Sequence, residues 1–141
     1  MKKTHQENTA QILYAAFRII IGLMFTLHGA SKFGLIGEGS IRGFASTFSL
    51  PLWLAALVAA IELIGGILIA LGLMTRLSAA FGGIVMLVAI VMVHIPKGPW
   101  YNPLANGAEL PLMFIASFLV MLAYGSGRYG IEKAITDKEL L

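Results

Sequence analysis

The chain has 141 residues and a mean hydropathy of +0.86, with 58% hydrophobic and 12% charged residues. Because soluble proteins are about half apolar and a quarter charged, this composition excludes a soluble catalytic domain and predicts one integral membrane domain, residues 1–141. The lack of cysteine excludes disulfide relays, thiolate metal sites and iron–sulfur clusters, and the net charge of +3 indicates membrane topology rather than a nucleic-acid surface.

Four apolar segments are long enough to span a bilayer as helices, at about 11–30, 52–73, 77–95 and 108–124. The first carries Arg18 and is longer than the core of a signal peptide, so we expect no cleavage. Long loops at about 34–50 and 96–106 alternate with a tight turn at 74–76. The sequence therefore predicts an all-α, integral membrane four-helix bundle.

One face of the first predicted span combines charge with glycine. At ~100° per residue, the face holds Arg18, Gly22, Phe25, Gly29 and Lys32 within ~40° of one line, with His28 ~80° to one side. Glycines let a neighbouring helix come close, which is how transmembrane helices associate when hydrophobicity cannot drive their contact. We therefore predict that this face points into the protein.

Positive charge is distributed unequally between the two sides of the predicted bundle. The termini and the short turn carry six basic residues, Lys2, Lys3, Arg76, Arg128, Lys133 and Lys138, whereas the long loops carry three, Lys32, Arg42 and Lys97. Lysine and arginine concentrate on the cytoplasmic side of membrane proteins. We therefore expect both termini in the cytoplasm and both long loops outside.

Arg18 and Glu62 are charges inside the first and second spans. A charge at the centre of a bilayer helix costs roughly 2.5–3.5 kcal/mol by insertion measurements, so each needs a partner or water. At ~1.5 Å per residue, Arg18 lies roughly 19 Å and Glu62 roughly 15 Å from the outer ends of their spans. We predict a buried Arg18–Glu62 ion pair, which either fixes the helix register alone or forms the polar floor of a cavity open to the outside.

Four further polar residues, His28, Lys32, His94 and Glu109, lie at the outer ends of the first, third and fourth spans. Three helices would thus bring them to one layer, where we predict that they bind a ligand. Three of them, His28, His94 and Glu109, also have a structural interpretation. Glu109 follows Asn106 with the spacing of a capping box, and histidines suit the headgroup region.

The ligand that these residue types favour is a quinone. Two histidines and a carboxylate could hold a metal, and two histidines could hold haem, but no span has the Glu-x-x-His or His-Glu-x-x-His spacing of helical metal sites. We therefore predict no metal centre and place haem below quinone. A histidine or lysine can donate to a quinone carbonyl, a carboxylate can move protons, and the ring can pack against Phe25, Phe33, Trp100 or Tyr101.

The chain resembles the DoxX family in the order and spacing of several short motifs. These are Arg18 with Gly22, His28–Lys32, Glu62–Gly66 followed by Leu71–Arg76, then His94, Asn106–Leu110 and Gly125–Arg128. The resemblance implies a four-helix bundle in the cytoplasmic (plasma) membrane of a bacterium or archaeon. Family members resemble a thiosulfate:quinone oxidoreductase, are linked to oxidative-stress complexes with soluble enzymes or, among distant eukaryotic relatives, act as cargo receptors or assembly chaperones.

Two hypotheses for the function follow. In the first, the chain is the membrane subunit of a quinone-linked redox or oxidative-stress system, with a soluble oxidoreductase subunit as partner and the ligand at the outer polar residues. In the second, it is a non-enzymatic membrane adaptor or assembly factor for a protein partner. The glycine-lined faces would serve packing within the bundle or between subunits of a homo-oligomer. A transporter is disfavoured because no broken helix is evident.

Overall fold

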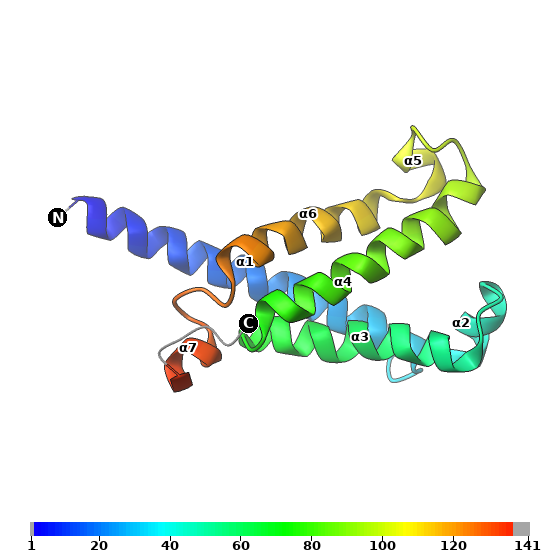
Figure 1. Cartoon of the computed structure of the whole chain (residues 1–141), viewed down its shortest axis with the longest axis horizontal. Coiled ribbons are helices and arrows are strands. Elements are labelled where there is room, and N and C mark those ends of the chain that lie inside the picture. Colours follow the sequence, from blue (N-terminus) through cyan, green and yellow to red (C-terminus); the bar gives the residue numbers. More distant parts are fainter. Residues whose placement is uncertain (1, 137–141) are drawn as a thin grey trace.

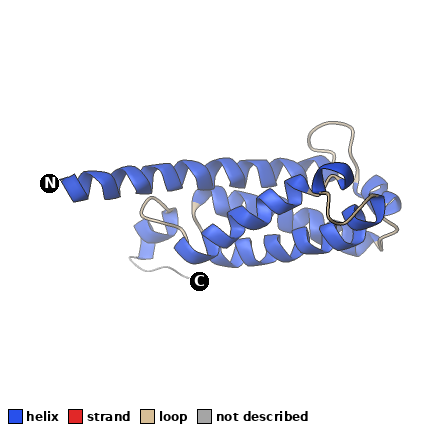
Figure 2. Ribbon diagram, turned by 90° about the horizontal axis from the view of Figure 1, so that it is seen from above, coloured by secondary structure: helices blue, strands red, loops and turns tan. Residues whose placement is uncertain are grey.

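The computed structural model describes residues 2–136, so Met1 and residues 137–141, which include Lys138, lie outside it. In this range the chain forms helices joined by loops, with no strand (Figures 1 and 2), which confirms the predicted all-α class. The helices are α1 (Lys2–Lys32), α2 (Ile41–Thr47), α3 (Leu52–Leu71), α4 (Thr75–Ala89), a π-helix (Ile90–His94), a 3₁₀-helix (Ile95–Lys97), α5 (Pro103–Asn106), α6 (Glu109–Tyr124) and α7 (Ile131–Thr136).

Four helices, α1, α3, α4 and α6, form the bundle (Figure 1). α1 packs along antiparallel α3, α3 turns into α4, and α4 packs along antiparallel α6. We call the end with the α3–α4 turn the turn end, and the opposite end, with the two long loops, the loop end. Both termini of the described chain lie at the turn end, where the first turns of α1 project beyond the bundle (Figures 1 and 2).

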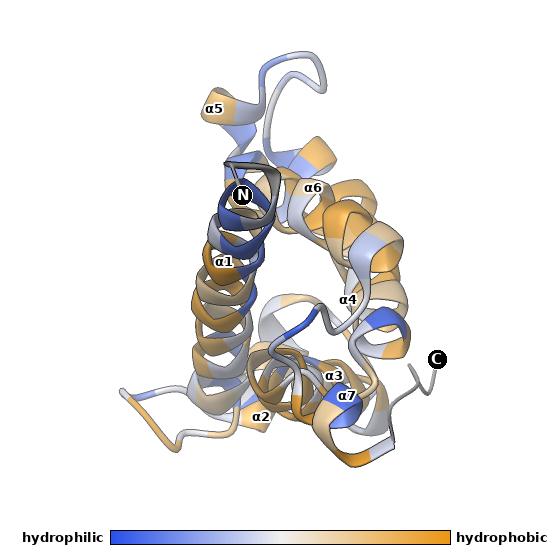
Figure 3. Ribbon diagram, turned by 90° about the vertical axis from the view of Figure 1, so that its left-hand side faces the viewer, coloured by the Kyte–Doolittle hydropathy of each residue, from blue (hydrophilic) through white to orange (hydrophobic). Residues whose placement is uncertain are grey.

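Three helical segments are long and apolar enough to cross a membrane, namely Thr4–Lys32, Leu52–Leu71 and Thr75–Lys97. α6, with 16 residues, is shorter. Figure 3 shows polar N-terminal turns on α1 and largely apolar helices behind them. Large apolar side chains point outward, as Leu13 and Met113 do at 65 and 67% exposure, and such a surface suits lipid rather than water. The chain is therefore a membrane protein.

Glycines bring the backbones of α1 and α3 into direct contact. A Cβ atom added at Gly22 would lie 2.5 Å from the backbone nitrogen of Ala70 and 2.7 Å from the carbonyl oxygen of Gly66. Gly29 faces the backbone of α3 at Leu63 in the same way. Because apolar side chains gain little by leaving lipid, close backbone packing of this kind holds transmembrane helices together. The glycine face of α1 is buried, as its spacing predicts.

Phe25 marks the level at which all four helices of the bundle meet. Its ring is fully buried and lies next to Gly65 of α3 and Gly82 of α4. It also packs edge-on against Phe118 of α6, with 5.0 Å between the ring centres. Positions along the bundle axis can therefore be measured from this level on every helix.

The third span is not one continuous α-helix, contrary to the expectation from the sequence. α4 passes into the π-helix shortly before Pro96, and α5 is separated from α6 by Gly107, whose φ is +75°. Proline lacks a backbone N–H and its ring clashes with the carbonyl four residues earlier, which explains why the regular helix loosens there. The loop end of α4 and α6 is therefore irregular.

We expect Gly22→Ala to destabilise the bundle by about 1–3 kcal/mol, because the added methyl group meets backbone atoms of α3 that cannot swing away. Thermal unfolding of the detergent-solubilised protein, followed by circular dichroism, measures this effect. Gly83→Ala is the matched control, since nothing lies within 4 Å of a Cβ added at that position of α4. Equal stability of the two variants would contradict the close contact between α1 and α3.

Candidate functional site

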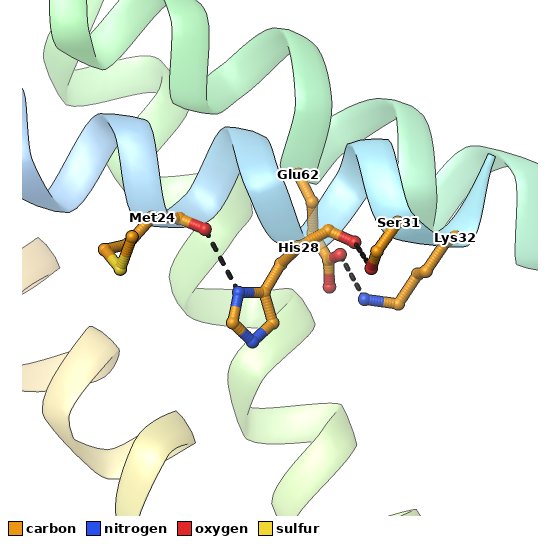
Figure 4. Close-up of polar contacts among 5 residues, drawn as sticks. All are labelled: Met24, His28, Ser31, Lys32 and Glu62. Atoms are coloured by element: carbon orange, nitrogen blue, oxygen red, sulfur yellow. Dashed lines mark hydrogen bonds and ion pairs between the residues drawn. The ribbon is translucent and has the colours of Figure 1, made fainter. Parts of the chain in front are cut away.

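A buried ion pair joins α1 to α3 near the loop end. Lys32 donates from Nζ to Oε2 of Glu62 (Figure 4). The Glu62 side chain is 3% exposed and that of Lys32 17%. Lys32 is the last residue of α1, and Glu62 projects from the middle of α3 toward it. Opposite charges attract strongly where water is excluded, so each side chain compensates the other.

His28 lies beside this pair and completes what we call the loop-end cluster (His28, Lys32 and Glu62). Its ring is close enough to Glu62 to interact with it electrostatically. Nδ1 lies 3.0 Å from the carbonyl oxygen of Met24, so this nitrogen carries a proton and Nε2 keeps a lone pair in the neutral ring. The ring packs edge-on against Phe114 of α6, with 5.6 Å between centres. The imidazole thus faces the interior between α1 and α6.

The loop-end cluster combines a cationic donor and an imidazole from one turn of α1 with a carboxylate from α3. Among the hydrogen bonds of residues 2–136, neither Nε2 of His28 nor Oε1 of Glu62 has a partner. Both atoms are therefore available to accept a hydrogen bond from a ligand. In the same range, no three His, Asp or Glu side chains are placed to hold a metal ion.

Among the described residues, Glu62 pairs with Lys32 and not with Arg18, the partner predicted from the sequence, although both Arg18 and Glu62 are buried, at 1 and 2% exposure of the residue. At ~1.5 Å per residue, Arg18 lies about 10 Å from the Phe25 level toward the turn end, and Glu62 lies about 5 Å from it toward the loop end. The prediction assumed that the outer ends of the two helices lie at the same level along the bundle axis. The glycine contacts instead place the start of α3 roughly 9 Å beyond the end of α1, which brings Glu62 level with His28.

Arg18 binds the C-terminal end of α3. Its guanidinium donates to the carbonyl oxygens of Ile69 and Ala70, the latter at 2.8 Å, and reaches that of Tyr129 at 3.4 Å. The last carbonyl groups of a helix have no partner within the helix and carry the negative end of its dipole, so a cation is stabilised there. Arg18 thus links α1 to the end of α3 at the turn end, and it lies outside the loop-end cluster.

Glu132 of α7 is a buried carboxylate that the sequence analysis did not single out. It is 1% exposed, and its Oε2 accepts a hydrogen bond from the backbone N–H of Met74 at 3.0 Å. Its own backbone N–H donates to the carbonyl oxygen of Gly72 at 3.1 Å. Gly130 fits directly against Gly72, where a Cβ would lie 2.6 Å from the Gly130 Cα. Paired glycines are the only signal in the sequence for this contact between distant segments.

His94 and Glu109 do not join the loop-end cluster. His94 ends the π-helix and donates from Nδ1 to the carbonyl oxygen of Asn106 at 3.0 Å. Glu109 is exposed in the first turn of α6. At ~1.5 Å per residue, the two lie about 18 and 13 Å from the Phe25 level, against about 5 Å for His28 and about 10 Å for Lys32. The four residues predicted to form one layer are therefore spread along the bundle axis, and we call the part around His94 and Glu109 the second layer.

Asn106 organises the second layer and was considered in the sequence only as a helix cap. Its side chain is buried, donates from Nδ2 to the carbonyl oxygen of Pro99 at 3.1 Å, and accepts from the N–H of Ala108 at 2.9 Å. The N-cap of α6 is Ala108, so the capping box expected between Asn106 and Glu109 is not formed. Asn106 instead fixes the loop against the π-helix through His94.

A hollow of about 330 Å³ opens at the loop end beside Lys32, and we call it the α2 hollow. The side chains that line it include Ser31, Lys32, Ser40, Phe44, Thr47 and Phe48. Lys32 Nζ lies 5.1 Å from the ring centre of Phe44, and Lys97 Nζ lies 5.6 Å from that of Phe48. The two rings pack edge-on, with 5.2 Å between their centres. Lys32 therefore contacts both the α2 hollow and the buried carboxylate.

Comparisons with known proteins identify one family model and several relatives. The DoxX family model matches residues 13–95, which include all three residues of the loop-end cluster. An uncharacterised Haemophilus influenzae protein is 36% identical over 125 residues, 88% of this chain and 91% of the relative. The Bacillus subtilis protein named "Putative oxidoreductase CatD" is 35% identical over 109 residues, 77% of this chain and 76% of the relative. An uncharacterised membrane protein of Mycobacterium tuberculosis is 26% identical over 150 residues, 95% of this chain and 86% of the relative. No solved structure matches the chain.

Lys32→Met should destabilise the fold by about 3–5 kcal/mol, because it leaves the Glu62 carboxylate buried without its partner. The double variant Lys32→Met, Glu62→Leu removes both charges and should recover most of that loss. Thermal unfolding of the wild type, both single variants and the double variant gives the coupling energy of the pair. A coupling energy near zero would show that the two side chains do not interact.

Arg18→Met should loosen the turn end, because each lost hydrogen bond from a charged donor removes about 1.5–3 kcal/mol. We expect faster amide hydrogen exchange at residues 129–132, which Arg18 and the α3–α4 turn hold, and unchanged exchange in α2 at the opposite end. Arg18→Lys keeps the positive charge at the end of α3 and should restore part of the protection. Unchanged exchange at residues 129–132 in Arg18→Met would contradict this role.

Proposed function

Because this chain belongs to the DoxX family, we propose that it is the membrane subunit of a quinone-linked redox or oxidative-stress system and binds a small lipid-soluble ring at its loop end. The loop end then faces outward, with both termini in the cytoplasm of a prokaryote and the bundle in the plasma membrane, as the distribution of lysine and arginine favours. The relative named as an oxidoreductase supports the redox part of the proposal.

The observation that carries the proposal is the loop-end cluster itself. A lysine, a carboxylate and a histidine converge between two packed transmembrane helices. An ionisable group there costs several kcal/mol unless a partner or water compensates it, so such groups usually mark functional sites. A purely structural pair would need only Lys32 and Glu62. His28 adds a third ionisable group with an unpaired ring nitrogen, and such groups are frequent at binding sites.

The three side chains suit the two oxygen atoms of a quinone ring. Lys32 can donate a hydrogen bond to a carbonyl oxygen of the quinone, while Glu62 and Nε2 of His28 can accept one from a hydroxyl group of the quinol, which forms when the ring takes up two electrons and two protons. Phe114, which contacts His28, offers an aromatic surface nearby. A bound quinone would supply the electron-accepting ring, and the chain would supply binding, orientation and proton exchange.

The electrons would come from a soluble oxidoreductase partner. Nothing in the composition of the chain gives it an electron carrier of its own, since it has no cysteine for an iron–sulfur cluster or a redox disulfide. Such a partner would have to meet the ring at the loop end, because nothing in the chain would carry electrons between the two ends of the bundle. The first turns of α1, which project beyond the bundle at the turn end (Figure 2), suit the second candidate, a non-enzymatic adaptor or assembly factor that holds a protein partner at the membrane.

The test is to purify the chain gently from its native membrane and identify bound molecules by mass spectrometry and absorption. We expect a co-purifying quinone in the wild type and its loss in the double variant His28→Ala, Glu62→Gln, because the variant lacks two of the three polar contacts. The matched control is His94→Ala, Glu109→Ala, which alters the second layer and should keep the ligand. Empty, folded wild-type protein would favour the adaptor, and loss of the ligand only in the control would place the site in the second layer.

A further inference from the structure

We infer that the ligand of this protein is a tailless aromatic ring that reaches the loop-end cluster through the α2 hollow, rather than a long-tailed quinone that enters from the lipid. This inference rests on the proposed function and narrows its ligand. It follows from the size of the α2 hollow, the chemistry of its rim and the position of Lys32.

The size of the α2 hollow suits one or two fused rings. Its volume of about 330 Å³ is at the lower end of the range of small-molecule sites, about 300–1,000 Å³. Phe44 and Phe48 supply an aromatic wall, and their edge-on contact holds the two rings in a fixed relative orientation. A flat ring can pack against such a wall in an offset-stacked or edge-on arrangement, both of which aromatic rings favour.

The rim of the α2 hollow is polar and does not suit an apolar tail. Apart from the two phenylalanines, its lining consists of hydroxyl-bearing, charged and glycine residues, with Ser31, Ser40 and Thr47 among them and Glu38 at the loop. A polyisoprenoid tail that lay against these groups would leave polar groups without water. A ring without a tail meets no such cost.

Lys32 connects the α2 hollow to the loop-end cluster. Its ammonium group bonds to the buried Glu62 and at the same time lies over the ring of Phe44. A carbonyl oxygen on a ring stacked at Phe44 would therefore meet the same ammonium group that holds the carboxylate. On the far side, Lys97 lies over Phe48 and links the 3₁₀-helix after α4 to α2, so the aromatic wall is held from two helices.

The test compares menadione with menaquinone, which share one ring system and differ in the polyisoprenoid tail. Binding of labelled menadione to the full chain in lipid nanodiscs is measured by equilibrium dialysis, with empty nanodiscs to subtract partitioning and with menaquinone in the lipid as competitor. The chain has no cysteine, so menadione cannot react with a thiol. We expect saturable binding of menadione that unlabelled menadione displaces and menaquinone does not.

Variants of the two phenylalanines that form the aromatic wall test whether menadione binds in the α2 hollow. Phe44→Ala and Phe48→Ala should each weaken menadione binding by up to about tenfold, since stacking contributes about 0.5–1.5 kcal/mol beyond buried area. Phe81→Ala is the matched control, because that ring is on α4, half exposed and outside the α2 hollow. Should the Phe variants fail to fold, Thr47→Trp, which fills the hollow from an exposed position, should abolish binding in their place.

The outcomes separate this inference from the proposed function. Competition by menaquinone, or menadione affinity unchanged in the wall variants, would overturn the inference and leave a quinone site elsewhere in the bundle. If menadione does not bind but menaquinone co-purifies with the protein, the inference is also overturned, while the proposed quinone site remains. Binding of neither molecule to the folded chain would overturn the inference and the proposed function together.

Discussion

The close contact between α1 and α3 fixes the rest of the molecule. Glycine at positions 22 and 29 of α1 and 66 of α3 lets the two backbones touch, and a contact between backbones allows only one axial register. That register brings Glu62 level with His28 and within reach of Lys32, and it places Arg18 at the end of α3. The polar groups of the bundle thus have their partners because small residues set how far one helix is displaced along the other.

The protein compensates buried charge in two different ways. Lys32 and Glu62 neutralise each other, which suits a site that a ligand can approach, since the pair can open without leaving a net charge. Arg18 has no carboxylate within the described residues and instead binds carbonyl groups at a helix end. Hydrogen bonds from a charged donor contribute about 1.5–3 kcal/mol each, so two of them offset an insertion cost of roughly 2.5–3.5 kcal/mol. A backbone alone can therefore hold an arginine in the membrane.

Sequence patterns predicted which side chains of a single helix are buried. They missed the contacts that depend on how two helices are placed relative to each other. The buried face of α1 follows from the spacing of Arg18, Gly22 and Phe25, and burial of Glu62 follows from its place in an apolar run. The predicted pairing of Arg18 with Glu62 was not found, because the lengths of the spans do not show how far one helix is displaced along another. The position of His94 failed for a related reason, since the π-helix before Pro96 and the break at Gly107 change the depth reached by the chain. Buried Glu132 depends on a contact between distant turns that no local period signals.

The shortness of α6 affects the lipid around the protein. Its 16 residues span about 24 Å, whereas the hydrocarbon core of a bilayer is about 30 Å thick. Lipids next to α6 must shorten or tilt their acyl chains, while those next to α1 need not, so the bilayer around one molecule is thinner on one side than on the other. Each ångström of mismatch costs a fraction of a kcal/mol. An uneven annulus of this kind would favour thin membrane regions and would lower the cost of bringing the short sides of two molecules together, because they would then share one deformed patch.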